Sequence, residues 1–376
     1  MTEHDNTVTA AWHGDGLCLE GHSPLQRIRV LHRADLLALP QRLAELLAPG
    51  QVAVGLLGYH AGALLADVDA AGVMPLAEVQ IFAAEDIRRR PLADAVETGP
   101  SFALQSDFRS EMPSVDYRRA IARIHDYLRA GDCYQINLAR RFSSHFRGDP
   151  LSAWRRLSAA HPAPHSSFFR FADGDCVFGV SPERFLQIRN GIVVTEPIKG
   201  SRPRGITAEQ DQKIGEALQS SPKDRAENLM IVDLLRNDLG QVCEAGSVKA
   251  EPLFELRRFS NVQHLVSTIT GTLRAGVLPL AALLACFPGG SITGAPKKRA
   301  MQIIAELELV PRGFYCGSQF VLDSDGNLDS NILIRTFQTS GEQIVCHGGG
   351  GIVIDSDAEQ EYQESLFKVE KLMASL

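Results

Sequence analysis

The amino-acid sequence predicts an α+β protein in which large antiparallel β-sheets pack as a sandwich with helices outside. One observation is the Asn190-Gly191 pair between two β-rich arms in FLQIRNGIVVTEPI, which is a strong short-range hairpin signal. A second is the C-terminal third, where residues 318–354 form a succession of strand-like segments separated by turn residues. A third is that strands and helices do not alternate regularly, which argues against βαβ units and a parallel sheet.

Composition limits the possible functions. The chain has 376 residues, of which 44% are hydrophobic and 22% charged, so it can bury a sizeable core. Its formal net charge of −7 argues against nucleic acid or an anionic membrane as the main partner. Apolar runs are too short for a membrane helix, and the acidic N-terminus is not a secretory signal. The seven scattered cysteines contain no C-x-x-C pair, which predicts reduced thiols in a cytoplasmic protein.

The chain is predicted to have three regions. Residues 1–85 form a β-rich N-terminal subregion, residues 86–114 form a connector that lacks periodicity, and residues 115–376 form the main domain. Within the main domain, apolar spacing predicts helices in 116–132, 221–240, 295–308 and 357–376. Gly131 is expected to end the first of these helices, and Ser221 with Pro222 to begin the second.

Lys199, in the segment EPIKGSRPRG, is a lysine at the exit of a predicted hairpin strand, just before a Gly200-Ser201 turn. A phosphate-binding P-loop needs the lysine after the glycine and a helix beyond it, so this order disfavours a nucleotide site. A catalytic amine and an ordinary loop cation both remain open. Residues 348–351 are four glycines that precede a strand, which excludes a dinucleotide fingerprint. They are either a flexible turn or a row of bare amides that a carboxylate can approach.

Two predicted helices carry paired carboxylates. Glu361 and Glu364 share a face with Lys368 in the C-terminal helix, and Asp224 and Glu227 share a face in the helix at 221–240. The first set is also consistent with a solvent-exposed face that has a Glu364–Lys368 pair. Two carboxylates from each of two helices would suit Mg²⁺, which accepts few carboxylates together with waters and ligand oxygens.

Seven segments together resemble the chorismate-utilising enzymes, and they occur in order along the chain. The resemblance covers residues 115–376 and extends into the N-terminal part only through 52–62. The segments are GDCYQINLARRF (131–142), SPERF (181–185), EPIKGSRPRG (196–205), DRAENLMIVDLLRND (224–238), FPGGSITGAPKKRAMQII (287–304), YCGSQFVLDSDGNLDSNILIRT (315–336) and GGGGIVIDSDAEQEYQES (348–365).

The resemblance implies a role for each candidate residue. Glu227 and Glu364 would bind Mg²⁺ directly, and Asp224 and Glu361 through waters, so that the metal holds the ring carboxylate of chorismate. Glu183 would be the general acid that helps the C4 hydroxyl to leave. The remaining implied substrate-binding residues are Ser201, Ser291, Gln135, Tyr315, Arg335 and Lys368, together with the backbone amides of Gly349 and Gly351. His264 matches the active-site histidine of the family, although a buried core histidine is the alternative.

Two positions indicate which reaction within the family this chain catalyses. Members that use water as the nucleophile carry a lysine base at the position of Gln135, and glutamine cannot take a proton at neutral pH. Lys199 resembles members that attach nitrogen at C4, whereas members that attach it at C2 typically have alanine there. The resemblance therefore implies a covalent Lys199 intermediate and the product 4-amino-4-deoxychorismate, a precursor of 4-aminobenzoate and folate. Nitrogen transfer to C2 and a non-catalytic chorismate-binding regulatory protein are the alternatives.

The implied partners are chorismate, a separate glutamine amidotransferase subunit that supplies ammonia, and a downstream lyase that consumes the product. No G-x-C-x-G nucleophile segment is present for the chain to release ammonia from glutamine itself. Two departures from the family pattern occur: Ser201 stands where threonine is common, and four glycines replace a Gly-Ala-Gly pattern, which would loosen the carboxylate site.

Overall fold

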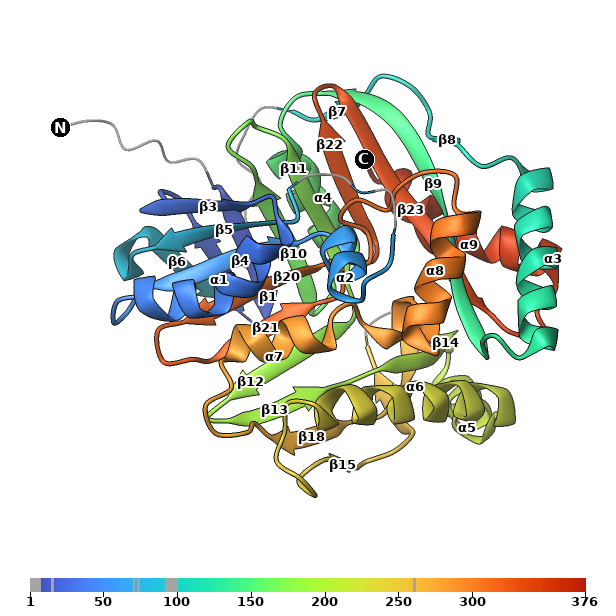
Figure 1. Cartoon of the computed structure of the whole chain (residues 1–376). Helices are drawn as coiled ribbons and strands as arrows, with labels where there is room; N and C mark the ends of the chain where they lie inside the picture. The colour runs from blue at the N-terminus through green and yellow to red at the C-terminus, as the bar shows by residue number, and fades with distance from the viewer. Residues whose placement is uncertain (1–7, 15–16, 70–71, 73–74, 92–100, 260–261) are drawn as a thin grey trace.

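Two large antiparallel sheets pack face to face in the computed structural model (Figure 1). The structure describes residues 8–14, 17–69, 72, 75–91, 101–259 and 262–376. Within this part of the chain, all named strand pairs are antiparallel. The predicted α+β sandwich with helices outside is confirmed.

The first sheet has eleven strands, and the long strands β9 and β23 are neighbours near one end of it. Its order is β19 (Gly294–Ala295), β9 (Gln135–Arg147), β23 (Gln343–Ile352), β22 (Thr336–Ser340), β11 (Cys176–Ser181), β10 (His165–Arg170), β1 (Ala10–Gly14), β2 (Leu17–Gly21) and β6 (Ile87–Pro91), with β7 (Ala103–Leu104) and β8 (Arg109–Ser110) beside β9.

The second sheet has nine strands, and a third, small sheet carries Lys199. The second is ordered β15 (Lys249–Ala250), β18 (Ile269–Thr272), β13 (Ile192–Thr195), β12 (Arg184–Arg189), β21 (Leu328–Asn331), β20 (Ser318–Asp323), β4 (Val52–Leu57), β5 (Ala77–Phe82) and β3 (Gln26–Val30). The third is ordered β14 (Ile198–Pro203), β17 (Val262–Val266) and β16 (Glu255–Arg258).

The interface between the two large sheets is apolar with a few buried amides. Phe169 and Val177 of the first sheet share a core cluster with Val54 and Phe82 of the second. Gln319 on β20 donates its side-chain Nε2 to the Ala11 carbonyl at 2.9 Å, across the interface. Because a buried amide without a partner is costly, such bonds favour one alignment of the two sheets.

Helices cover the outer faces (Figure 1). The second sheet packs against α1 (Arg33–Leu46), α2 (Tyr59–Leu65), α6 (Pro222–Gly240) and α7 (Pro279–Cys286), and the first sheet against α4 (Pro150–Ala160) and α9 (Ala358–Met373). The helices α3 (Ser114–Ala130) and α8 (Lys297–Leu307) pack against β9, and α5 (Ala208–Ser220) against the third sheet. The predicted helix ends are confirmed: Gly131 follows α3 with φ 81°, and the Ser221 side chain accepts from the Asp224 N–H at the start of α6.

Three strand predictions can be compared with the structure. The Asn190-Gly191 hairpin joins β12 and β13 with φ values of 50° and 75° and is confirmed. The prediction that the C-terminal strands form one meander is wrong. The β20–β21 pair belongs to the second sheet, and the β22–β23 pair belongs to the first. The turn expected after Lys199 is also wrong. Lys199 and Ser201 lie in the same strand, β14, and Gly200 forms a bulge between them.

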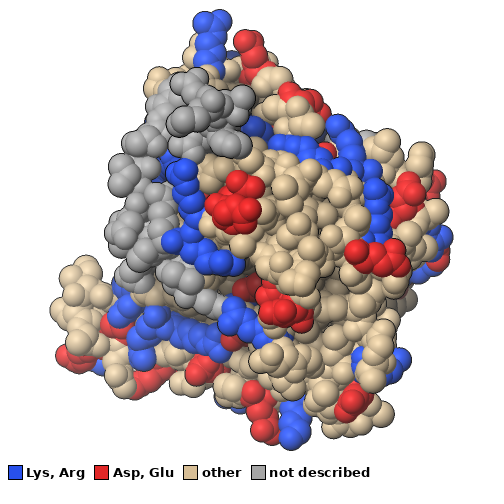
Figure 2. All heavy atoms as spheres, turned by 90° about the vertical axis from the view of Figure 1, so that its left-hand side faces the viewer, with Lys and Arg blue, Asp and Glu red and all other residues tan. Residues whose placement is uncertain are grey.

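The N-terminal strands are not a separate layer. β1 pairs with β10, and β4 pairs with β20. The division at residues 85 and 114 therefore does not coincide with a boundary between sheets, and it remains a prediction. Over the described residues, no helix is long and apolar enough to cross a membrane. Acidic and basic side chains are both spread over the face shown in Figure 2.

Candidate active site

The predicted site residues come from strands of the first and third sheets, from helices and from loops. They lie in β14 (Lys199, Ser201), β17 (His264), β23 (Gly349, Gly351), α6 (Asp224, Glu227), α9 (Glu361, Glu364, Lys368) and the short 3-10 helix η3 at Gly290–Ile292 (Ser291), with Gln135 opening β9, Glu183 between β11 and β12, and Tyr315 and Arg335 in loops before β20 and β22.

Glu183 is a buried carboxyl group beside Lys199. Its residue is 6% exposed, and Ser291 Oγ donates to its Oε1 at 2.7 Å. Burial raises the pKa of Glu183, while the Ser291 bond and the positive charge of Lys199 oppose the shift. A carboxyl group that keeps its proton near neutral pH can serve as a general acid.

Lys199 is held in place by the bulge at Gly200. The register runs from Lys199 opposite Leu265 to Ser201 opposite His264, so Gly200 is the extra residue. Gly200 has φ 77°, a backbone conformation that favours glycine, and a Cβ there would lie 2.8 Å from Asp224 Oδ1. Burial lowers the pKa of Lys199, with Glu183 and Glu227 opposing. A larger share of neutral amine follows, which is the nucleophilic form.

Ser201 on β14 and His264 on β17 form a hydrogen-bonded pair, in which the histidine is buried and the serine is exposed. Ser201 Oγ lies 2.7 Å from His264 Nδ1, and His264 is 3% exposed. Burial and the nearby Arg335 charge lower the pKa of His264 to about 4, and a hydrogen bond with the Gly200 backbone opposes this shift. His264 is therefore a neutral imidazole that orients the Ser201 hydroxyl, and the same contact is consistent with a core histidine.

The carboxylates of α6 and α9 face one another. Burial raises the pKa of Glu227, while the positive charges of Lys199 and Lys223 oppose the shift. The pKa of Glu361 is raised by burial and by Glu364, while Ser356 donates to its Oε1 at 2.8 Å. In both cases the effect of burial outweighs the positive charges of the neighbouring lysines.

Three of these carboxylates have a cationic neighbour, and for Glu227 it is Lys223, whose Nζ lies 4.0 Å from its Oε1. Burial alone would raise the pKa of Glu364, but Lys368, whose Nζ lies 2.7 Å from its Oε1, lowers it. Arg202 pairs with Asp224 at 3.0 Å. The described residues contain no group of three or more His, Cys, Asp or Glu arranged to hold a metal ion. The donor chemistry of Glu227 and Glu364, two partly buried oxygen ligands on separate helices, fits a hard cation.

The four glycines lie in the strand β23, so the alternative of a flexible turn is wrong. Gly349 lies opposite Ala139, and Gly351 opposite Asn137, on β9. The Ala139 N–H donates to Glu308, and the Asn137 N–H donates to the Thr293 carbonyl, so the backbone hydrogen-bonding groups of both residues point away from β23. In antiparallel pairs the backbone groups of opposite residues point either both inward or both outward.

The amides of Gly349 and Gly351 therefore point away from β9. The strand on that side, β22, pairs with β23 only as far as Cys346. Lys368 Nζ donates to the Gly349 carbonyl at 2.9 Å, next to these amides. A Cβ on Gly350 would lie 3.2 Å from both Glu361 Oε2 and Lys368 Nζ, so the glycine strand lies directly against the carboxylate cluster.

Two further predicted residues have polar groups without a hydrogen-bond or ion-pair partner among the described residues. Arg335 forms no ion pair with any described carboxylate, and burial alone lowers its pKa. Gln135 is 1% exposed, and its Nε2 has no hydrogen-bond partner among the described residues. Tyr315 stacks on His347 with ring centroids 4.9 Å apart. A half-buried cation and an unpaired buried amide are what an anionic ligand would engage.

Sequence reasoning missed the buried pair of Arg312 and Glu308 and its neighbour His347. The spacing of Glu308 and Arg312 at i, i+4 was visible, but past the end of a predicted helix it is typical of a solvent-exposed pair. In the structure the two side chains are 7% and 1% exposed.

The fold and this site define a class of protein. Residues 22–374 match the family model for chorismate binding enzyme, so the chain belongs to that family. Anthranilate synthase component I from Streptococcus pneumoniae TIGR4 superposes with a TM-score of 0.82 at 27% identity, covering 95% of this chain and 92% of that one. A 2,3-dihydroxybenzoate-specific isochorismate synthase from Bacillus anthracis has the same fold, with a TM-score of 0.80 at 19% identity over 99% and 97% of the two chains.

Among curated relatives, aminodeoxychorismate synthase component 1 of Klebsiella aerogenes is 47% identical over 302 residues, or 80% of this chain and 67% of that protein. The protein of the same name from Escherichia coli K12 is 47% identical over 77% of this chain and 64% of its own length. Anthranilate synthase component 1 of Pseudomonas aeruginosa is 43% identical over 69% and 53%. The chain thus spans about two thirds of the length of the first two relatives.

Proposed function

We propose that the chain is an aminodeoxychorismate synthase component 1, which converts chorismate and ammonia into 4-amino-4-deoxychorismate. The observation that carries this proposal is Lys199, a lysine with lowered pKa that the Gly200 bulge holds beside Glu183, whose pKa is raised by burial. The relatives named for this activity support the same choice, because they are 47% identical to the chain, whereas the anthranilate synthases are 38–43% identical.

In the first step, the neutral amine of Lys199 attacks C2 of chorismate. The two ring double bonds shift toward C4, the C4–O bond breaks, and Glu183 gives its proton so that water leaves. The new C2–N bond leaves a proton on the lysine nitrogen, which returns to the Glu183 carboxylate. Glu183 is thereby ready to act again, with Ser291 holding its Oε1.

In the second step, ammonia attacks C4 and the double bonds shift back. The C2–N bond to Lys199 breaks, with Glu183 protonating the departing amine and then accepting the proton released by the new C4 ammonium group. Two displacements of this kind place nitrogen at C4, whereas a single displacement by ammonia places it at C2. Gln135 stands where a base would activate water, and its amide can only donate to or accept from the ligand.

Chorismate carries two carboxylates, and the site offers a group for each. The enolpyruvyl carboxylate would lie against Arg335, Tyr315, Lys368 and the amides of Gly349 and Gly351, where cationic and N–H donors are free to receive it. The ring carboxylate would lie against the α6–α9 cluster, where Glu227 and Glu364 would hold Mg²⁺ directly and Asp224 and Glu361 through waters. Such an ion supplies positive charge that offsets both the glutamates and the ring carboxylate.

The relatives are named as component 1, which supports a separate partner that supplies ammonia, proposed here as a glutamine amidotransferase subunit. An aminodeoxychorismate lyase would consume the product. The cytoplasmic location remains a prediction.

The test is identification of the product by chromatography after incubation with chorismate, Mg²⁺ and ammonium. We expect 4-amino-4-deoxychorismate from the wild type and a loss of at least a hundredfold in rate for Lys199→Ala. Intact mass spectrometry without ammonia should detect an adduct on the wild type and none on the variant. Anthranilate as the product would refute the proposed C4 chemistry, and no turnover at all would favour a binding protein.

A further inference from the structure

We infer that the buried pair Arg312–Glu308 is a positioning pair that holds two segments of the proposed active site, β9 and the 3-10 helix η3, from the side opposite the ligand. Neither residue belongs to the set that would touch the substrate. The inference rests on the proposed function only in its kinetic readout, because the geometry stands on the structure alone.

The pair is closed off from solvent and doubly bonded. Arg312 Nε lies 2.8 Å from Glu308 Oε2, and its Nη2 lies 2.6 Å from Glu308 Oε1. The guanidinium carbon lies 4.7 Å from the ring centroid of Tyr59 in α2 and 5.7 Å from that of Tyr315. The planar guanidinium group is thereby fixed on its edge and beside two rings.

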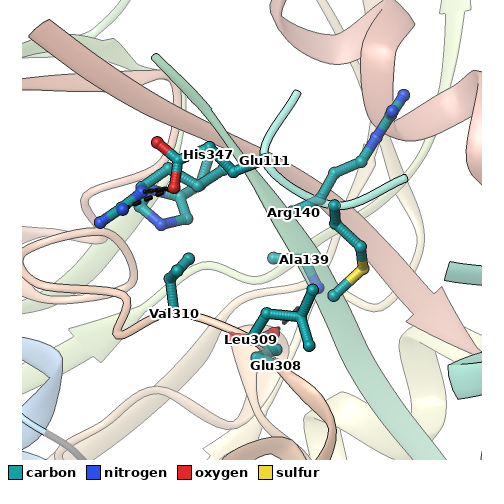
Figure 3. A pocket seen from close by; sticks show the side chains of 9 residues that line it. Glu111, Ala139, Arg140, Glu308, Leu309, Val310 and His347 are labelled. Atoms are coloured by element: carbon teal, nitrogen blue, oxygen red, sulfur yellow. Dashed lines mark hydrogen bonds and ion pairs between the residues drawn. The ribbon is translucent and has the colours of Figure 1, made fainter. Parts of the chain in front are cut away.

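The remaining polar capacity of the pair goes to the backbone. Arg312 Nη2 donates to the Asn137 carbonyl at 2.6 Å, and Nη1 donates to the Ile292 carbonyl at 3.0 Å. Glu308 Oε1 accepts the Ala139 N–H at 2.9 Å. Figure 3 shows Glu308 beside the strand at Ala139, in a pocket that His347 also lines.

These backbone atoms belong to the segments that carry the proposed ligand contacts. Asn137 and Ala139 are the β9 partners of Gly351 and Gly349. The Arg312–Glu308 pair therefore fixes this edge of β9 and, through β9, the direction in which the two glycine amides point. Ile292 follows Ser291, which donates to the proposed general acid. One ion pair thus positions both the proposed carboxylate site and the proposed acid.

A charged pair suits this role better than apolar residues. Three backbone groups on this side of β9 have no partner in a neighbouring strand. They are the carbonyls of Ile292 and Asn137 and the N–H of Ala139. Apolar side chains would leave these groups buried and unbonded. Because a buried ion pair contributes little net stability compared with apolar packing, its backbone bonds give a more direct reason for its presence.

The test compares Arg312→Lys with Arg170→Lys as a matched control. Arg170 also pairs with a carboxylate, Asp149, at 2.6 Å, but between β10 and the start of α4. Hydrogen–deuterium exchange is measured on peptides covering 135–141 and 346–352 without ligand, and kcat and KM for chorismate are measured across pH. Lysine keeps the charge but cannot bond Glu308 twice and also reach both carbonyls.

We expect Arg312→Lys to speed exchange in both peptides about tenfold or more and to lower kcat/KM about a hundredfold, the cost of a small misplacement of reacting groups. We also expect the acidic limb of its kcat–pH profile to shift, because Ser291 no longer holds Glu183. Arg170→Lys should leave all three unchanged. Wild-type exchange and wild-type kcat/KM in a folded Arg312→Lys protein would overturn the inference.

A second variant covers the case in which Arg312→Lys does not fold. The double substitution Arg312→Met with Glu308→Met replaces the pair by apolar side chains, which often preserves stability. A folded double variant should show the same loss of kcat/KM, and full activity in it would refute the inference. If neither variant folds, the pair serves folding itself and the positioning role is rejected. Failure of the wild type to make the amino product would refute the proposed function while leaving the exchange result intact.

Discussion

Removal of the Arg335 charge is expected to increase the stability of the ligand-free protein and to weaken the binding of chorismate. The side chain is a half-buried cation that forms no ion pair with any described carboxylate, and its backbone has φ 52°. We consider Arg335→Met, which keeps an unbranched side chain of similar length and removes the charge. Ligand-free protein should become more stable, because an unpaired charge is no longer held out of water.

The magnitude for stability is small. Partial exposure limits the penalty for Arg335 to about 1 kcal/mol. Unfolding entropies near 2.1 cal/mol/K per residue give about 0.8 kcal/mol/K for 376 residues, so this corresponds to a rise of about 1 °C in Tm. For binding, loss of a charge-assisted bond to a carboxylate costs about 1.5–3 kcal/mol, which is about ten- to hundredfold in the Kd for chorismate.

Differential scanning calorimetry without ligand and isothermal titration with chorismate measure the two effects. Arg170→Met is the control, because Arg170 has an ion pair with Asp149 and its loss should lower Tm without changing chorismate affinity. An Arg335→Met protein with a lower Tm and unchanged affinity would refute the reasoning, since it would show that Arg335 stabilises the fold and does not receive a ligand.

Two other substitutions test the site in different ways. His264 has a pKa of about 4 in the folded protein and about 6.5 when unfolded, so between these pH values the unfolded state binds more protons and stability falls as pH falls. His264→Gln should reduce this slope of stability against pH by up to about 1.4 kcal/mol per pH unit. Urea unfolding at pH 7 and pH 5 measures the slope, and an unchanged slope in the variant would contradict the prediction. A Cβ on Gly348 would lie 2.0 Å from the Ser365 carbonyl oxygen in α9, so Gly348→Ala should destabilise the protein by about 1–3 kcal/mol. A Cβ on Gly350 would lie 3.2 Å from the ends of the Lys368 and Glu361 side chains, so Gly350→Ala should leave stability nearly unchanged and weaken chorismate binding. Equal losses of stability in the two variants would show that the contact between Gly348 and α9 is not decisive.

Much of the fold could be predicted because local signals were strong. The Asn190-Gly191 turn, the Gly131 helix end and the Ser221 cap each follow from one or two residues, and each is confirmed. The assignment of β20–β21 and β22–β23 to different sheets was not predictable, because it depends on the crossing between Asn331 and Thr336 and on distant partners. Strand pairing over long separations leaves no periodic signal in one sequence.

The site shows the same contrast. Helical spacing was enough to place Glu361, Glu364 and Lys368 together, and the structure brings them against the glycine strand. The bulge at Gly200 was read as a turn, because glycine is typical of both and only the register with β17 distinguishes them. The Arg312–Glu308 pair was not visible at all, since burial of an i, i+4 ion pair depends on what packs over it.

The pairing of β4 with β20 has a consequence for how the chain folds. β4 lies between β5 and β20, so one of its two edges stays open until residues near 320 have been made. β23 similarly closes onto β9 about two hundred residues after β9 has left the ribosome. Such non-local closure slows folding and exposes unpaired edges for the interval. At about 5–20 residues per second of synthesis, that interval lasts on the order of ten seconds or more. During it the nascent chain has no complete large sheet, and its unpaired strand edges can pair with other chains.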